Sequence, residues 1–174
     1  MTIRPGTAAD AAALADFAAR TFAETFAADC APADMEEHLA RAYGIAQQTA
    51  ELTDPGTATL LAEEAGILVG YAQVRRAPLP SCVTAPDATE LHRFYVDRAA
   101  HGTGVAPALM SAVRAAAIAA GARNMWLGVW ENNRRALRFY AKCGFVDVGS
   151  HTFVLGSDPQ TDRVMVSPIP VRQE

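Results

Sequence analysis

Residues 95–110, "YVDRAAHGTGVAPALM", place two glycines between a predicted strand and a predicted helix. The strand is predicted at residues 89–97, "TELHRFYVD", from its two-residue alternation. The helix follows from Val105 and ends at Gly121, because apolar residues recur there at helical spacing. The order of strand, glycine loop and helix therefore carries the first information about fold and function.

A glycine loop that enters a helix is a natural site for a phosphate group. Its peptide N–H groups point outward together, and the helix dipole adds partial positive charge. Gly102 and Gly104 allow a ligand to approach the backbone closely, and Pro107 is tolerated in the first helical turn. The loop predicts an anion site, with a plain strand-to-helix turn as the alternative that a short glycine motif leaves open.

Two familiar phosphate loops do not fit this stretch. A nucleoside-triphosphate loop ends in Gly-Lys-Ser/Thr, but Val105 and Ala106 follow Gly104 here. A dinucleotide loop needs an acidic residue about 20 positions later to hold the ribose, and no Asp or Glu occurs between Asp97 and Glu131. Both readings are therefore excluded.

A second motif lies in residues 127–145, "LGVWENNRRALRFYAKCGF". It predicts a strand followed by a helix over residues 132–143. Asn133 and Tyr140 are seven residues apart, so they share one helical face and can meet the same extended ligand. A helix N-cap for Asn133 and a core aromatic for Tyr140 are the structural alternatives.

Together the two motifs resemble the GNAT superfamily of acyl-CoA-dependent N-acetyltransferases. Its Gln/Arg-x-x-Gly-x-Gly/Ala signature follows a strand that ends in valine, as Val96 does here. The match at His101, Gly104 and Ala106 departs at the first position, where histidine replaces the usual Gln or Arg. The family's N-x-x-A-x-x-x-Y-x-x-x-G-F pattern is matched by Asn133, Ala136, Tyr140, Gly144 and Phe145.

Two further stretches narrow the resemblance to the PaiA-type branch, which includes polyamine acetyltransferases. They are "TFAETF" at residues 21–26 and "GSHTFVLGSDPQTDRVMV" at residues 149–166. The resemblance covers nearly the whole chain and implies a single N-acetyltransferase domain over residues 1–174. It implies acetyl-CoA as the co-substrate and no metal.

The remaining pattern agrees with an α/β or α+β layer fold around a mixed sheet. Thr7 is a predicted N-cap. Helices are predicted at residues 8–25, 33–42, 45–52, 105–120 and 132–143, and strands at 3–4, 89–97, 122–131, 145–155 and 163–169. Residues 57–77 predict two further strands joined by a turn from Glu63 to Gly66. The resemblance implies a mostly antiparallel central sheet with helices on both faces and a splay between the two central strands.

The resemblance also implies how acetyl-CoA would bind. Its pyrophosphate would lie over residues 102–106, and its pantetheine would pair with the backbone of residues 94–96 like an added strand. The predicted cofactor-binding residues are Phe94, Tyr95, Val96, His101, Gly102, Thr103, Gly104, Val105, Ala106, Asn133 and Tyr140. Arg134, Arg135 and Arg138 either touch the 3′-phosphate or form a solvated helix face.

In the implied reaction the amine attacks the thioester directly. A backbone N–H near Val96 would stabilise the tetrahedral intermediate, and Tyr140 would protonate the CoA thiolate. Glu90 and Glu131 are the candidate bases, with His92 and His151 as lesser options. The structural alternative is that each carboxylate is simply a solvated charge at the end of a strand.

Composition limits the partners. The net charge is −4 and the pI about 5.5, so no basic field is available for nucleic acid or anionic lipid. A small-molecule amine, polyamine-like by the resemblance, is the expected acceptor; antibiotic and protein amines are the alternatives. Acidic residues of the first helices form a candidate polycation surface or simply helix-start charges: Asp29, Asp34, Glu36 and Glu37.

Two functions of other classes remain open from the sequence. One is a non-catalytic acyl-CoA-binding sensor, suggested by the substituted His101; the other is a nucleotide-phosphate binder of another fold. Cys30, Cys82 and Cys143 are odd in number and widely spaced, which argues against disulfides and a zinc site. No apolar leader or span is seen, which favours the cytoplasm, and the family resemblance brings the expectation of a homodimer.

Overall fold

The computed structural model describes residues 1–170, so the last four residues of the expected 1–174 domain lie outside the described residues. One seven-stranded sheet has the order β1-β2-β3-β4-β5-β7-β6. The strands are β1 Thr2–Pro5, β2 Thr57–Glu64, β3 Ile67–Arg75, β4 Ala88–Val96, β5 Asn124–Trp130, β6 Val146–Leu155 and β7 Asp158–Pro168. The helices are α1 Ala11–Phe26, α2 Pro32–Tyr43, α3 Ile45–Thr53, α4 Val105–Ala119 and α5 Arg134–Lys142.

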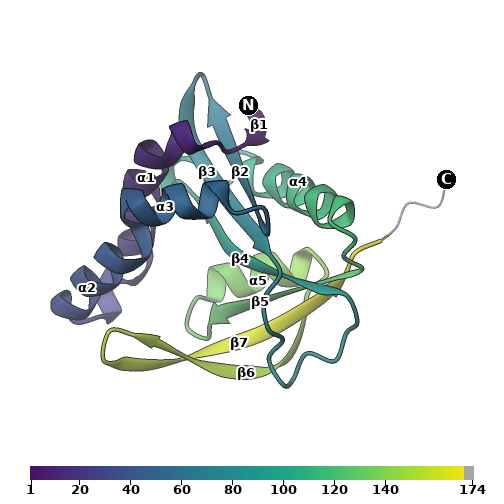
Figure 1. The fold of residues 1–174 in the computed structure, drawn as a ribbon. Coiled ribbons are helices and arrows are strands. Elements are labelled where there is room, and N and C mark those ends of the chain that lie inside the picture. Colours follow the sequence, from purple (N-terminus) through teal and green to yellow (C-terminus); the bar gives the residue numbers. More distant parts are fainter. Residues whose placement is uncertain (171–174) are drawn as a thin grey trace.

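The two central strands, β4 and β5, separate along their length. They pair in parallel through Ala88–Glu90 and Asn124–Trp126, whereas every other neighbouring pair described in the sheet is antiparallel. Beyond Glu90 and Trp126 the strands diverge, and the sheet opens into two arms (Figure 1). This confirms the mixed, mostly antiparallel sheet with a central splay.

A β-bulge in β4 sets the direction of the side chains at the splay. Gln73 faces Arg93 while Val74 faces Leu91, so His92 is the extra residue. A bulge of this kind re-aims the side chains that follow it. Phe94 consequently joins the core beneath α4 and α5, whereas Tyr95 joins the core on the other face.

Helices cover both faces of the sheet, as expected (Figure 1). On one face α4 and α5 enclose a core that includes Leu109 and Leu127. On the other face α1 and α2 pack over a second core that includes Phe22 and Tyr71. Among the helices of residues 1–170, none is long and apolar enough to cross a bilayer.

A buried ion pair fastens α3 to β4. Arg93 Nη1 lies 2.6 Å from Glu51 Oε2, and Arg93 Nη2 donates to the Ala42 carbonyl at 3.1 Å. Gln73 Nε2 also donates to Glu51, and the guanidinium of Arg93 stacks 4.6 Å from the Tyr43 ring centre. With only 8% of its side chain exposed, Arg93 is a fully partnered interior charge.

Thr7 is the N-cap of the helical segment that begins at Ala8, as predicted, but the first turn, Ala8–Asp10, is a 3₁₀ turn that leads directly into α1; the Thr7 N–H donates to Asp10 Oδ2 at 2.8 Å. One predicted boundary was wrong. The last strand begins at Asp158, well before the predicted residue 163. Its polar first half resembles loop sequence, but it pairs with β6 in a long hairpin that ends beside α2 (Figure 1).

Candidate active site

The splay between β4 and β5 opens into a cavity of about 1080 Å³. One end is bounded by the loop before α4 and by the first turn of α5. The other end is bounded by α1, α2 and the β6–β7 hairpin. This volume suits an extended ligand together with a second small molecule.

The glycine loop has the backbone of an anion cradle. Gly102 and Gly104 have φ values of +81° and +97°, and a Cβ built on either would meet nothing within 4 Å. The α4 helix starts at Val105, so the N–H groups of its first turn have no intrahelical acceptor. The N–H and the hydroxyl of the predicted residue Thr103 instead donate to the Ala100 carbonyl, at 3.4 Å and 2.8 Å. The remaining peptide N–H groups of residues 102–106 have no acceptor among the described residues, which fits a pyrophosphate.

The open edge of β4 is formed by alternate residues. The Asp97 N–H donates to the Val69 carbonyl of β3 at 2.8 Å, which fixes the direction of the preceding peptides. By alternation, the N–H and C=O of Phe94 and Val96 face the splay, whereas those of Tyr95 face β3. Phe94 and Val96 can thus pair with an added strand; Tyr95 contributes its side chain to the cavity wall.

His101, the departure from the family signature, links this edge to α5. Its Nε2 lies 3.0 Å from the Val96 carbonyl, and Arg135 Nη1 contacts its Nδ1. We assign the neutral tautomer in which Nε2–H donates to Val96 and Nδ1 accepts from Arg135. The imidazole therefore donates to the Val96 carbonyl, a hydrogen-bond acceptor that an added strand would otherwise use.

The α5 helix supplies the two predicted ligand-facing residues. Asn133 is its N-cap, because Oδ1 accepts the Ala136 N–H at 3.1 Å, and its side chain also borders the cavity. Tyr140 is packed among Phe94, Phe139 and Phe145, with ring centres 5.5–6.2 Å away. Burial raises the pKa of the Tyr140 phenol, so it stays protonated at neutral pH.

The two predicted bases have different surroundings. Glu90 borders the cavity, 2.6 Å from Arg75 Nε and 3.5 Å from His92 Nδ1. Burial alone would raise the pKa of Glu90, but hydrogen bonds from His92 and Arg75 together hold it below its usual range. Glu131 is exposed and is not among the residues that border the cavity, so the structure does not bring it to the splay.

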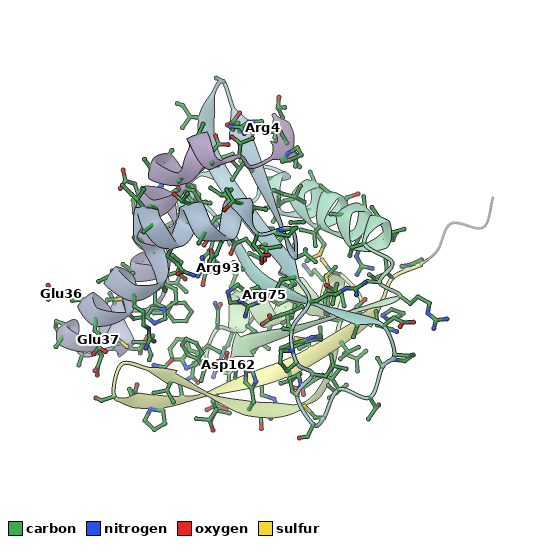
Figure 2. The ribbon with its side chains drawn as sticks, in the orientation of Figure 1. Arg4, Glu36, Glu37, Arg75, Arg93 and Asp162 are labelled. Atoms are coloured by element: carbon green, nitrogen blue, oxygen red, sulfur yellow. The ribbon has the colours of Figure 1, made fainter. Side chains whose placement is uncertain are left out.

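Sequence reasoning missed Asp162. It lies on β7 directly opposite Trp130 of β5 and His151 of β6, and its Oδ2 is 3.8 Å from His151 Nε2. Figure 2 shows it on the β6–β7 side of the splay, across from Arg75 and Arg93. Burial raises the pKa of the Asp162 carboxyl. Asp162 falls between the predicted strands at residues 145–155 and 163–169, and the stretch at residues 149–166 that carries the branch resemblance assigns it no role.

The acidic residues of the first helices have separate roles. Asp29 borders the cavity. Asp34 accepts the Ser157 N–H at 2.9 Å and so holds the tip of the β6–β7 hairpin. Glu36 and Glu37 are exposed on α2 and lie outside the cavity wall (Figure 2). The predicted polycation surface is therefore reduced to Asp29 at the cavity itself.

The splayed sheet and glycine loop agree with a comparison of the chain with known families. A model described as "Acetyltransferase (GNAT) family" matches residues 16–145. The chain belongs to this family. An uncharacterized N-acetyltransferase of Mycobacterium tuberculosis is 42% identical over 156 residues, covering 87% of this chain and 96% of the relative. The GNAT assignment makes the protein an N-acetyltransferase with acetyl-CoA as co-substrate.

Solved GNAT structures share the whole fold. A GCN5-related N-acetyltransferase from Rhodopseudomonas palustris has a TM-score of 0.74 at 25% identity, covering 96% of this chain and 94% of that one. PaiA N-acetyltransferase from Thermoplasma acidophilum, solved with coenzyme A, has a TM-score of 0.76 at 18% identity, covering 97% and 99%. The PaiA similarity shows the fold alone.

Arg135 tests the cofactor end of the cavity. We expect Arg135→Ala to raise KM for acetyl-CoA roughly 3- to 10-fold, because it removes a charged donor that faces the glycine loop. The effect should shrink at high salt. Arg138→Ala is the matched control: Arg138 is on the same helix but is exposed and does not border the cavity. Equal KM values for the two variants would contradict this role.

Proposed function

We propose that the protein transfers the acetyl group of acetyl-CoA to the primary amine of a small, polyamine-like molecule by direct attack. The observation that carries this proposal is one cavity whose wall combines a phosphate cradle with acidic side chains. The glycine loop and the protonated Tyr140 border this cavity. The carboxylates of Glu90, level with Trp126, and of Asp162, opposite Trp130, also border it and would attract a cationic amine.

The amine nitrogen forms a bond with the thioester carbonyl carbon, giving a tetrahedral intermediate. Its oxyanion would accept a hydrogen bond from the N–H of Phe94 or Val96, both directed toward the splay by the alternation of β4. When the C–S bond breaks, the electron pair stays on sulfur as the CoA thiolate. Tyr140 then gives its proton to that thiolate, a role that a buried, protonated phenol supports, and its phenolate regains a proton from the nitrogen of the newly acetylated amine, directly or through water.

The attacking amine must first lose a proton. Glu90 and His92 form the candidate relay, since they are adjacent to each other at the cavity wall. Hydrogen bonds from His92 and Arg75 outweigh burial and lower the pKa of Glu90, which favours its ionised form. We therefore assign Glu90 to orienting His92 and a water molecule rather than to retaining the proton itself. The exposed position of Glu131 gives it no part in this step.

An acceptor panel tests the proposal. Purified protein with acetyl-CoA should release CoA thiol when given spermidine or a simple alkylamine, and the mass of the amine should increase by one acetyl group. Acetylation of an aminoglycoside or of a peptide N-terminus instead would assign the alternative acceptors. If CoA binds but no acceptor is acetylated, the non-catalytic sensor is the correct function. Size-exclusion chromatography of the same sample tests the expected homodimer.

A further inference from the structure

We propose that Asp162 binds the ammonium group of the acceptor, and that the acceptor carries this group on an apolar stem lying against Trp130 and Phe26. The inference rests on the proposed function, because it specifies the acceptor of that reaction. It assigns a binding role to a residue on the β7 arm, which faces the cavity opposite β4. Three features of the structure support it.

The first feature is the space made for the carboxylate. Trp130, Asp162 and His151 are register partners on three adjacent strands, so their side chains project from one face of the sheet. Beside them, Gly128 of β5 has no side chain. A Cβ there would lie 2.9 Å from His151 Nε2 and 3.3 Å from Asp162 Oδ2. The glycine therefore leaves room for the pair where β5 has already separated from β4.

The second feature is the unbalanced charge of Asp162. Other interior charges near the cavity have close ionic partners: Glu90 has Arg75 at 2.6 Å, and Arg93 has Glu51 at 2.6 Å. Within residues 1–170, no Arg or Lys side-chain nitrogen lies within 4 Å of the Asp162 carboxylate oxygens, and His151 Nε2 is 3.8 Å from Oδ2. The Asp162 side chain is nevertheless only 15% exposed. A partly buried carboxylate without an ionic partner is costly in free energy, and a bound cationic ligand would lower that cost by pairing with it.

The third feature is the aromatic wall beside the carboxylate. The rings of Phe26 and Trp130 lie 5.6 Å apart, and Phe22 lies 4.5 Å from Phe26. Phe153 of β6 also borders the cavity. Aromatic faces bury an apolar stem and attract a cation placed over them. The combination selects a primary alkylammonium or arylalkylammonium ion over a neutral or anionic molecule.

The test uses tryptophan fluorescence, because the chain has two tryptophans and only Trp130 borders the cavity; Trp126 is buried with Val83 and Val164. With CoA saturating, 2-phenylethylamine, hexylamine and spermidine are titrated into the protein. At least one amine should change the fluorescence, and 2-phenylethanol, which lacks the charge, should bind far more weakly. Asp162→Asn should raise the amine Kd about 10- to 100-fold without changing CoA affinity.

Asp158→Asn is the matched control, since it removes the same charge from the same strand at a residue that does not border the cavity. Its amine Kd should equal that of the wild type, and Asp162→Glu should recover part of the affinity. Gly128→Ala is a second variant, expected to displace His151 and raise the amine Kd several-fold. Absence of amine binding, or equal amine Kd values for Asp162→Asn and wild type, would overturn the inference.

Failure of this inference is distinct from failure of the proposed function. If an amine is acetylated with the same KM by wild type and by Asp162→Asn, the acetyltransferase proposal stands and Asp162 has no role in recognition. If amines bind through Asp162 but none is acetylated, the recognition site stands and the catalytic proposal is wrong.

Discussion

Tyr140→Phe is expected to lower kcat by about 100-fold or more while leaving CoA affinity unchanged. General acids typically contribute roughly 10²- to 10⁴-fold, and this variant removes only the phenolic proton donor. The ring remains enclosed by Phe94, Phe139 and Phe145, so the fold and the cofactor end are retained. Steady-state rates with a confirmed acceptor, and calorimetric titration with CoA, give the two quantities.

The control for this variant is Tyr71→Phe. Tyr71 is completely buried, its hydroxyl has no hydrogen-bond partner among the described residues, and it does not border the cavity. Removing an unpaired buried hydroxyl should leave the stability unchanged or slightly higher and should not alter kcat. A Tyr140→Phe enzyme that keeps wild-type kcat would exclude the phenol as the acid.

The pH profile gives an independent check on Tyr140. Because burial raises the folded-state pKa of the phenol, its acid form persists at neutral pH and is lost only as the pH exceeds that raised value. Activity that depends on this acid should therefore show no decline from Tyr140 between about pH 7 and pH 9. If kcat falls within that pH range in both the wild type and Tyr140→Phe, the fall must arise from the titration of another group.

Arg93→Met is expected to lower the free energy of unfolding by about 3–5 kcal/mol. Removing one partner of a buried ion pair leaves the other charge uncompensated, which costs about this amount. Here the stranded charge would be Glu51, which would keep only the hydrogen bonds from the neutral side-chain amides of Gln73 and Gln47. Urea unfolding followed by circular dichroism measures the change.

Two further variants separate the ion pair from general packing. Arg123→Met breaks a surface pair with Asp87, whose side chain is 50% exposed, and should change the stability little. Glu51→Gln combined with Arg93→Met removes both charges and should recover much of the lost stability. A loss below about 1 kcal/mol in Arg93→Met would show that the pair does not hold α3 to β4.

The cofactor end of the site was predictable because its signals are local. Gly102 and Gly104 mark a loop between a strand and a helix, and the spacing of Asn133 and Tyr140 places both along one cavity wall. The roles of individual residues were less predictable where they depend on the side of the strand toward which the peptide N–H and C=O groups point. The alternation of β4 turns the Tyr95 peptide toward β3, and only strand pairing reveals this.

The acceptor end depends on contacts between distant parts of the chain. Asp162 becomes a cavity residue because β7 pairs with β5 and β6 around Gly128, and none of these pairings has a short sequence motif. Glu131, near in sequence to Tyr140, is instead exposed beyond the end of β5. Sequence proximity to a known motif was therefore a poor guide to which carboxylate reaches the cavity.

The central claim is direct acetyl transfer from CoA to an amine. A single-turnover experiment with acetyl-CoA labelled in the acetyl group, excess protein and a confirmed acceptor tests it most directly. The label should pass to the amine nitrogen in step with an equal amount of free CoA, and none should be retained on the protein. Label that stays on CoA, appears as free acetate or remains covalently bound to the protein would contradict the claim.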